Sequence, residues 1–360
     1  MKKYLCHLSN FSFLTSILLG LLVSFLMLCS CKKPVKIDTV ELVENSLQND
    51  FIFIPVTIND SVYRFLFDTG SNSCVIDSAY AKKNGLNADG TSLTTISQID
   101  GTIREDSLSF SRKKISIGKM RTTGIFFLNQ YKGLAIDNID KTGAIMGMDI
   151  GRKYNWLFNF DDNTVTISKN RISIPALPDD QIFILDYYYS EYGITQMNLT
   201  IGEAIIQDVV FDTGYSGSWD VWYKAKKIDI VFSESDFDIV RRSLVKNLRH
   251  YSVMDFSAMG LGRSLIIDSL QINDLTMPGI FAIASKEKLK SLITVHFVRR
   301  FRMMYYDSMN QKIELYVSPS DSARHQRKDL QNFVRKSNQL YVEHNGVVSE
   351  NILSKLMELW

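Results

Sequence analysis

The stretch Phe65–Gly70 reads FLFDTG, and the same kind of junction returns at Val210–Gly214, which reads VFDTG. In both places an apolar run of strand-forming residues leads directly into Asp-Thr-Gly. Each residue type makes up roughly 5 to 7% of a typical chain, so two matched copies of one tripeptide are rarely expected by chance. The repetition therefore indicates two copies of one structural unit.

Two further pairs of segments match at nearly the same spacing. The three pairs are Asp68 with Asp212, Gly147 with Thr294, and Ser107–Leu128 with Ser264–Ile283. The first pair is 144 positions apart and the second 147. The third pair begins 157 positions apart, and similar offsets between several landmarks in the same order indicate an internal repeat. It predicts two lobes of one design, joined near Pro175–Asp180.

Short alternations of apolar and polar residues recur along both halves. Examples are NTVTIS (Asn163–Ser168), KKISIG (Lys113–Gly118) and KIELYV (Lys312–Val317). This period of two, broken by polar turns, is typical of antiparallel strands. Helical patterns are few and short, at Ser78–Asn84, Ser235–His250 and in the tail after Pro319. We therefore expect a mainly β fold with few short helices.

The chain is long enough to bury one large core or two medium-sized cores. It has 360 residues, of which 45% are hydrophobic and 6 are Pro. We divide it into a signal peptide (1–30), a polar tether (31–48), an N-terminal lobe (49–178), a C-terminal lobe (179–318) and a polar, partly helical tail (319–360).

The N-terminus indicates targeting. Lys2 and Lys3 precede the uncharged apolar stretch Phe11–Leu28, which ends in LCSC. Leu28 followed by small residues before Cys31 resembles the bacterial lipobox, in which the chain is cleaved before the Cys and a diacylglycerol is attached to it. That resemblance implies a lipoprotein anchored through Cys31 in the bacterial cell envelope, facing the periplasm or the cell surface. The alternative is a retained spanning helix, because the stretch is just long enough to cross a bilayer.

Cysteine content and net charge bear on two further properties, disulfide bonding and nucleic-acid binding. With Cys6 and Cys29 removed and Cys31 lipidated, Cys74 is the only thiol left, so no internal disulfide is expected. The 41 basic and 39 acidic residues become 39 of each once Lys2 and Lys3 are removed. A neutral chain gives no electrostatic reason to expect nucleic acid.

Asp-Thr-Gly also suits an ordinary structural turn, because the Asp side chain can hydrogen-bond within its own loop and Gly can adopt a positive φ. Here, however, each Asp follows a strand expected to be buried, and carboxylates in apolar surroundings favour a chemical role. If the lobes pack about a pseudo-twofold axis, Asp68 and Asp212 face each other. Two carboxyls that close share one proton, so one serves as base and the other as acid toward a water attacking a carbonyl. We expect the hydroxyls of Thr69 and Thr213 to bond across the interface.

Residues 49–318 resemble a single-chain, two-lobed aspartic protease of the pepsin/retropepsin clan, with an inter-lobe cleft. The resemblance is carried by FDTGSNSCVI and by AIMGMD at Ala144–Asp149, which is similar to the apolar-apolar-Gly ψ-loop motif of that clan and, with the residues after it, to bacterial retropepsin-like proteins. It implies that Asp68 and Asp212 are catalytic. The supporting loop residues that it implies are Thr69, Gly70, Ser71, Thr213 and Gly214.

The second lobe departs from the family pattern. Tyr215 stands where a Ser or Thr hydroxyl normally steadies the carboxylate, Thr294 replaces the ψ-loop Gly, and His296 replaces an acidic residue. We expect these changes to bear on the alignment of Asp212. The flap candidates are Gly101, which has no flap tyrosine near it, and Gly260.

Other chemistries lack their motifs. The sequence has no HExxH, P-loop or GxGxxG, and its five His are scattered, so no metal or cofactor is expected.

The run of three tyrosines at 187–189 is read either as an aromatic binding stripe or as a strand alternating in and out of the core. A homodimer is not required, because both halves of the site are in one chain, so we expect a monomer.

Two functions of different classes remain open. The first is an envelope-anchored aspartic endopeptidase that cuts peptide or protein substrates. The second is a lipoprotein of the same fold that binds extended peptides without cleaving them.

Overall fold

The computed structural model describes residues 37–42, 51–97, 103–129, 143–215, 227–246, 253–255, 263–286 and 290–318, together with residues 328, 330–332, 335 and 336 of the tail. Strands dominate these ranges, so the predicted mainly β class is confirmed. None of the helices in these ranges has the length and hydrophobicity needed to span a membrane.

The strands of the first half form one sheet. Its order is β2 (Phe53–Ile58), β3 (Ser61–Phe67), β8 (Ala144–Met146), β4 (Cys74–Asp77), β7 (Met120–Asn129), β6 (Ile103–Ile117) and β5 (Gly90–Ser97). Two short helices, α2 (Ser78–Lys83) and α3 (Met148–Gly151), follow β4 and β8. The β2–β3 hairpin turns through Asn59 and Asp60, which both have positive φ, as a two-residue hairpin loop that follows the strand twist requires.

The second half repeats this arrangement strand for strand. Its order is β12 (Tyr188–Tyr189), β13 (Thr195–Ile201), β14 (Ala204–Asp212), β19 (Leu292–Thr294), β15 (Ile230–Ser233), β18 (Leu275–Ser285), β17 (Ser264–Ile272) and β16 (Val253–Asp255). The helices α4 (Glu234–Lys246) and α5 (Val295–Val298) follow β15 and β19, as α2 and α3 follow β4 and β8. Apart from the added β12, the strand order of the two sheets is the same, which is the repeat expected from the sequence.

Both sheets curl back on themselves and both contain the same parallel pairs. β2 also pairs with β6, and β13 with β17, so each sheet closes in a barrel-like manner. β3 runs parallel to β8, and β14 runs parallel to β19. The segments of these strands that form the parallel pairs, Phe65–Phe67 with Ala144–Met146 and Val210–Asp212 with Leu292–Thr294, are buried, which explains their mostly apolar sequences.

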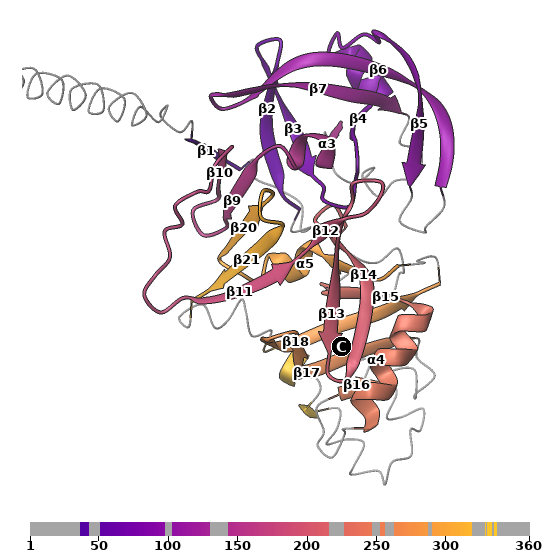
Figure 1. Cartoon of the computed structure of the whole chain (residues 1–360), viewed down its shortest axis with the longest axis vertical. Coiled ribbons are helices and arrows are strands. Elements are labelled where there is room, and N and C mark those ends of the chain that lie inside the picture. The colour runs from indigo at the N-terminus through magenta and orange to yellow at the C-terminus, as the bar shows by residue number, and fades with distance from the viewer. Residues whose placement is uncertain are drawn as a thin grey trace, which may run out of the picture. The chain divides into compact units, whose positions relative to one another are not determined.

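Strands from both halves build a third sheet. Its order is β1 (Ile37–Glu41), β10 (Thr164–Ser168), β9 (Asn155–Asn159), β20 (Met303–Asp307), β21 (Lys312–Val317) and β11 (Gln181–Asp186). Figure 1 shows β9, β20, β21 and β11 following one another in this sheet. β9 and β20 pair directly at its centre, so the two predicted lobes share main-chain hydrogen bonds.

Part of the segment expected to be a polar tether is a strand. β1 pairs with β10 in register from Ile37 opposite Ser168 to Glu41 opposite Thr164. Asp38 accepts a hydrogen bond from the backbone N–H of Lys119, which ties β1 to the β6–β7 turn. Polar residues alternate here with Ile37 and Val40, so the segment suits the edge of a sheet although its composition resembles a linker.

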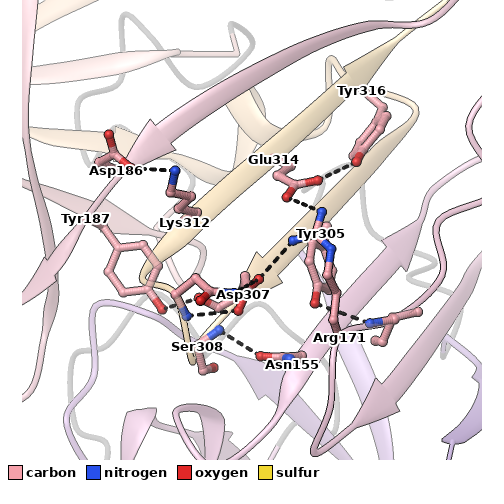
Figure 2. A network of polar contacts seen from close by, with 12 residues as sticks. Asn155, Arg171, Asp186, Tyr187, Tyr305, Asp307, Ser308, Lys312, Glu314 and Tyr316 are labelled. Atoms are coloured by element: carbon pink, nitrogen blue, oxygen red, sulfur yellow. Dashed lines mark hydrogen bonds and ion pairs between the residues drawn. The ribbon is translucent and has the colours of Figure 1, made fainter.

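Side chains link the connecting segments to the third sheet. Figure 2 shows Arg171 reaching two carboxylates on neighbouring strands, Asp307 of β20 at 3.2 Å and Glu314 of β21 at 2.8 Å. Nearby, Arg302 forms an ion pair with Asp180 in the segment that joins the two halves. These contacts fix the chain where it crosses from one half to the other.

Candidate active site

Asp68 directly follows β3, and the burial of that strand fixes its position. Phe65 and Phe67 are fully buried, so the strand cannot slip without exposing them. The N–H of Asp68 donates to the carbonyl of Met146 in β8 at 3.0 Å, which holds the loop against the neighbouring strand. The N–H of Gly70 then donates to Oδ1 of the Asp68 carboxyl at 2.8 Å.

Asp212 is held in the same way at the end of β14. Its side chain is buried, and its Oδ1 accepts the N–H of Gly214 at 2.9 Å. The N–H of Tyr215 lies 3.4 Å from the carbonyl of Asp212, the same distance as that between the N–H of Ser71 and the carbonyl of Asp68. The two loops therefore have matching backbone geometry.

The two carboxyl groups lie side by side. The Asp68 side chain makes a hydrogen bond with that of Asp212. Each glycine packs against the opposite carboxyl: a Cβ added to Gly70 would lie 2.5 Å from Cγ of Asp212, and one added to Gly214 would lie 2.3 Å from Cγ of Asp68. Any larger residue at either position would push the opposite carboxyl away, so both glycines are needed for this approach.

Two threonines fasten the loops to each other across the pseudo-twofold axis. The Thr69 hydroxyl donates to the carbonyl of Phe211 at 2.5 Å and accepts the N–H of Thr213 at 3.1 Å. In return, the Thr213 hydroxyl donates to the carbonyl of Phe67 at 2.7 Å and accepts the N–H of Thr69 at 3.2 Å. Both side chains are completely buried. The structure thus contains the cross-interface bonds expected from the sequence.

The electrostatics of the pair follow from burial and proximity. Removal from water, and then the neighbouring charge of Asp212, raise the pKa of Asp68 well above the usual range of a carboxyl. The backbone N–H groups of Gly70 and Ser71 oppose this rise but do not reverse it. The Asp68 carboxyl therefore retains a proton at pH values where exposed carboxyls are ionised.

Tyr215 occupies the position in the second loop that Ser71 occupies in the first. The two side chains differ, but the backbone contacts at this position are the same in both loops. Its carbonyl accepts the N–H of Val295 at 3.0 Å, as the carbonyl of Ser71 accepts the N–H of Met148 at 2.8 Å. The hydroxyl of Ser71 itself donates to the carbonyl of Ser73 at 2.9 Å. Ser71 supports Asp68 through its backbone N–H, an interaction that any residue type at this position can make.

The two ψ-loop positions, Gly147 and Thr294, differ in the space available for a side chain. A Cβ on Gly147 would lie 2.3 Å from the carbonyl oxygen of Ser73, so the first lobe requires glycine there. Thr294 has a similar extended backbone, is fully buried, and its hydroxyl donates to the carbonyl of Ile228 and accepts the N–H of His296. Its side chain is therefore bonded within its own lobe.

A buried ion pair supports this part of the second lobe and was missed from the sequence. Arg300 NH1 lies 3.2 Å from Oδ1 of Asp229, and both side chains are almost completely buried. The carbonyl of Asp229 accepts the N–H of Thr294 at 3.0 Å, and Oδ2 accepts the N–H of Phe281 at 3.0 Å. No local sequence pattern predicts this ion pair, because 71 positions separate Asp229 from Arg300 and only the fold brings them together.

Three predicted positions lie outside the described residues: the flap candidates Gly101 and Gly260, and the proposed lipid-bearing Cys31. The strands on either side of Gly101 are described, and β5 pairs with β6 up to Ser97 opposite Ile103. Among the described residues, no cluster of His, Cys, Asp and Glu side chains has the arrangement of a metal site.

Comparison with known proteins agrees with this geometry. Residues 54–150, from within β2 to α3, match the family model described as aspartyl protease. The matched region contains Asp68, Gly70 and Gly147, and therefore covers the first carboxyl-bearing loop and its ψ-loop. No curated protein matches the chain significantly. The match confirms the resemblance found in the sequence: over residues 54–150 the chain is similar to aspartyl proteases, which supports a protein of the pepsin/retropepsin clan.

Proposed function

We propose that this protein is an aspartic endopeptidase in which Asp68 and Asp212 form the catalytic dyad. The observation that supports this most strongly is the contact between the two carboxyls, that of Asp212 buried and that of Asp68 half-buried, each held by a glycine N–H and each lying against the other loop's glycine. A structural turn would not need two acids in contact, because their mutual repulsion destabilises the fold unless they share a proton.

The chemistry follows from the unequal protonation of the pair. Asp68 holds the shared proton and Asp212 is the base. Asp212 takes a proton from a water bound by both carboxyls, while the water oxygen attacks the peptide carbonyl carbon. Asp68 gives its proton to the carbonyl oxygen, which produces a neutral tetrahedral diol. On collapse, Asp212 protonates the leaving nitrogen and Asp68 recovers a proton from the diol.

The substrate class is an extended peptide or protein segment lying between the two lobes. We propose that the protein acts as a monomer, since one chain supplies both carboxyls. We further propose that it is tethered by lipid at Cys31 in the bacterial cell envelope, facing the periplasm or the cell surface.

The test uses protein lacking residues 1–31 and a mixed peptide library, incubated at several acidic to neutral pH values. We expect cleavage by the parent and its loss, by at least about a thousandfold, in Asp68→Asn and in Asp212→Asn, because each variant removes one half of the acid–base pair. Asp60→Asn is the matched control, since Asp60 is an exposed residue in the β2–β3 turn. Equal cleavage by all four proteins would contradict the proposal.

The second candidate function is peptide binding without cleavage in the same fold. It is favoured by the differences of the second lobe, where Tyr215 has no aliphatic hydroxyl to place beside Asp212 and Thr294 replaces glycine. Peptides retained by the parent protein but never cut, at any pH tested, would support this function instead.

A further inference from the structure

Besides the DTG loop of the second lobe, Thr195 of that lobe also contacts the first carboxyl-bearing loop. It is the first residue of β13 and is fully buried. Its N–H donates to the carbonyl of Thr69 at 3.4 Å, one residue beyond Asp68. Its hydroxyl lies 2.8 Å from the hydroxyl of Tyr306 in β20 of the third sheet.

Tyr306 belongs to a cluster of three tyrosine hydroxyls, two of them from the run Tyr187–Tyr189. The Tyr306 hydroxyl donates to that of Tyr189 at 3.3 Å, and Tyr189 lies 3.2 Å from the hydroxyl of Tyr187. The rings of Tyr187 and Tyr306 stack with centroids 4.9 Å apart. Tyr187 is buried and Tyr189 half-buried, whereas the hydroxyl of Tyr188 bonds the exposed Asp208, so the run alternates in and out of the core as one of the two readings expected.

The direction of each bond in the cluster can be assigned. Tyr187 donates to the backbone carbonyl of Asp307 at 3.3 Å, a contact visible in Figure 2. Because each hydroxyl has one proton, Tyr189 must then donate to Tyr187, and Thr195 must donate to Tyr306. The result is a chain of donors that starts at Thr195 and ends at a main-chain acceptor, and the hydroxyls of Tyr306 and Tyr187 are also in hydrogen-bond contact with each other. Burial raises the pKa of Tyr306 well above its usual range, so the hydroxyl keeps the proton that this chain requires.

We infer that Thr195 is a positioning residue for the Asp68 loop and that the hydroxyl chain through Tyr306, Tyr189 and Tyr187 fixes its place. This inference rests on the proposed peptidase function for its effect on catalysis. Thr195 does not touch the reacting atoms; it acts through the carbonyl of Thr69. The chain couples the Asp68 loop to the third sheet, where the two halves of the protein meet.

Adjacent tyrosines of β20 give a matched control. Tyr305 and Tyr306 are both fully buried, but the Tyr305 hydroxyl accepts the N–H of Ile172 at 3.3 Å and takes no part in the chain to Thr195. Replacing either tyrosine by phenylalanine removes one buried phenolic hydroxyl from the same strand. A general loss of stability would therefore affect both variants, whereas a positioning effect would affect only one.

The first test compares kinetics of the full-length chain purified in detergent. We expect Tyr306→Phe and Thr195→Val to lower kcat about tenfold, with KM changed less than about twofold, because small displacements of reacting groups are costly. Thr195→Ser, which keeps the hydroxyl, should stay near the parent rate, as should Tyr305→Phe. The pH at which kcat falls on the alkaline side should also move in Tyr306→Phe and in Thr195→Val, but not in Tyr305→Phe. Equal effects of Tyr305→Phe and Tyr306→Phe would overturn the inference.

The second test does not require activity. Backbone hydrogen exchange at the Thr195 amide reports directly on its bond to Thr69. We expect exchange there to become at least about tenfold faster in Tyr306→Phe and Thr195→Val than in Tyr305→Phe. If the parent cleaves no substrate, the proposed function fails while this measurement still decides the positioning role. Unchanged exchange in Tyr306→Phe and Thr195→Val would refute it.

Discussion

The Asp68 carboxyl links protonation to folding, because it is buried against a second acid. An unfolded Asp ionises near pH 3.9, whereas burial and the charge of Asp212 keep the folded carboxyl protonated to higher pH. Below the unfolded pKa both states carry the proton and the contribution to stability is complete. As pH rises toward the raised pKa, the unfolded state loses its proton first and the folded state loses relative stability.

This linkage predicts how Asp68→Asn changes stability. Asparagine has no proton to lose, so the variant should gain stability relative to the parent as pH rises from about 4. The gain should stop growing once pH exceeds the raised pKa of Asp68. Urea unfolding of both proteins across this range measures the difference, with the exposed Asp60→Asn as a control for removing a carboxyl. A difference that does not change with pH would contradict the prediction.

Individual residues of the site divide into those that the sequence could predict and those that it could not. Asp68, Asp212 and their threonines could be predicted because the tripeptide is local and occurs twice. Thr195 and the pair of Asp229 with Arg300 could not, since their contacts join strands that are distant in the chain. Hydrogen bonds of this kind depend on topology, which a linear pattern does not contain.

At the scale of elements, strong periodicity gave reliable predictions. The alternation in 312–317 corresponds to β21, and that in 163–168 to β10. The helix expected at Ser78–Asn84 is present as α2, whose first turn is capped by Asp77 accepting the N–H of Tyr80. β1 was not predicted because it lies at a sheet edge, where polar residues are tolerated and the composition resembles a linker.

The two DTG loops behave as one element, which predicts the effect of Thr213→Val. Valine has nearly the same shape but leaves the carbonyl of Phe67 and the N–H of Thr69 buried without this hydroxyl. Unsatisfied buried groups cost about 1–3 kcal/mol each, so for these two groups we expect a loss of roughly 2–6 kcal/mol in the free energy of unfolding. Thr213→Ser keeps the hydroxyl and should lose less than about half as much. Chemical denaturation of both variants decides the matter, and equal losses would show that the hydroxyl is not responsible.

For the whole molecule, the third sheet joins the two halves through the direct pairing of β9 with β20. Arg171 stabilises this sheet by neutralising two carboxylates: the Asp307 side chain is 0% exposed and that of Glu314 is 7% exposed. Loss of the cation would leave two like charges on adjacent strands with little access to water. The halves are therefore expected to unfold together rather than separately.

Arg171→Met tests this role of the sheet. Since Arg171 itself is half exposed, we expect a destabilisation of about 1–3 kcal/mol, less than for a fully buried ion pair. Lys312→Met is the control in the same sheet, because the pair of Lys312 with Asp186 is exposed and should contribute close to zero. Thermal unfolding followed by circular dichroism should give one transition in each protein, shifted only in Arg171→Met. Equal shifts in the two variants would contradict the assignment.

The proposed lipid anchor of the whole molecule requires a diacylglycerol on Cys31 and not on Cys29. The spacing from Leu28 to Cys31 predicts that Cys31→Ser abolishes incorporation of a labelled fatty acid when the full chain is expressed in a bacterial host, while Cys29→Ser does not. Two acyl chains hold a protein on a bilayer far more strongly than one, so the parent and Cys29→Ser should resist extraction by high salt. A parent protein that carries no label and yet remains membrane-bound would instead identify Phe11–Leu28 as a retained spanning helix. Labelling of Cys31→Ser at the parent level would exclude the lipoprotein assignment, because the diacylglycerol is attached through that thiol.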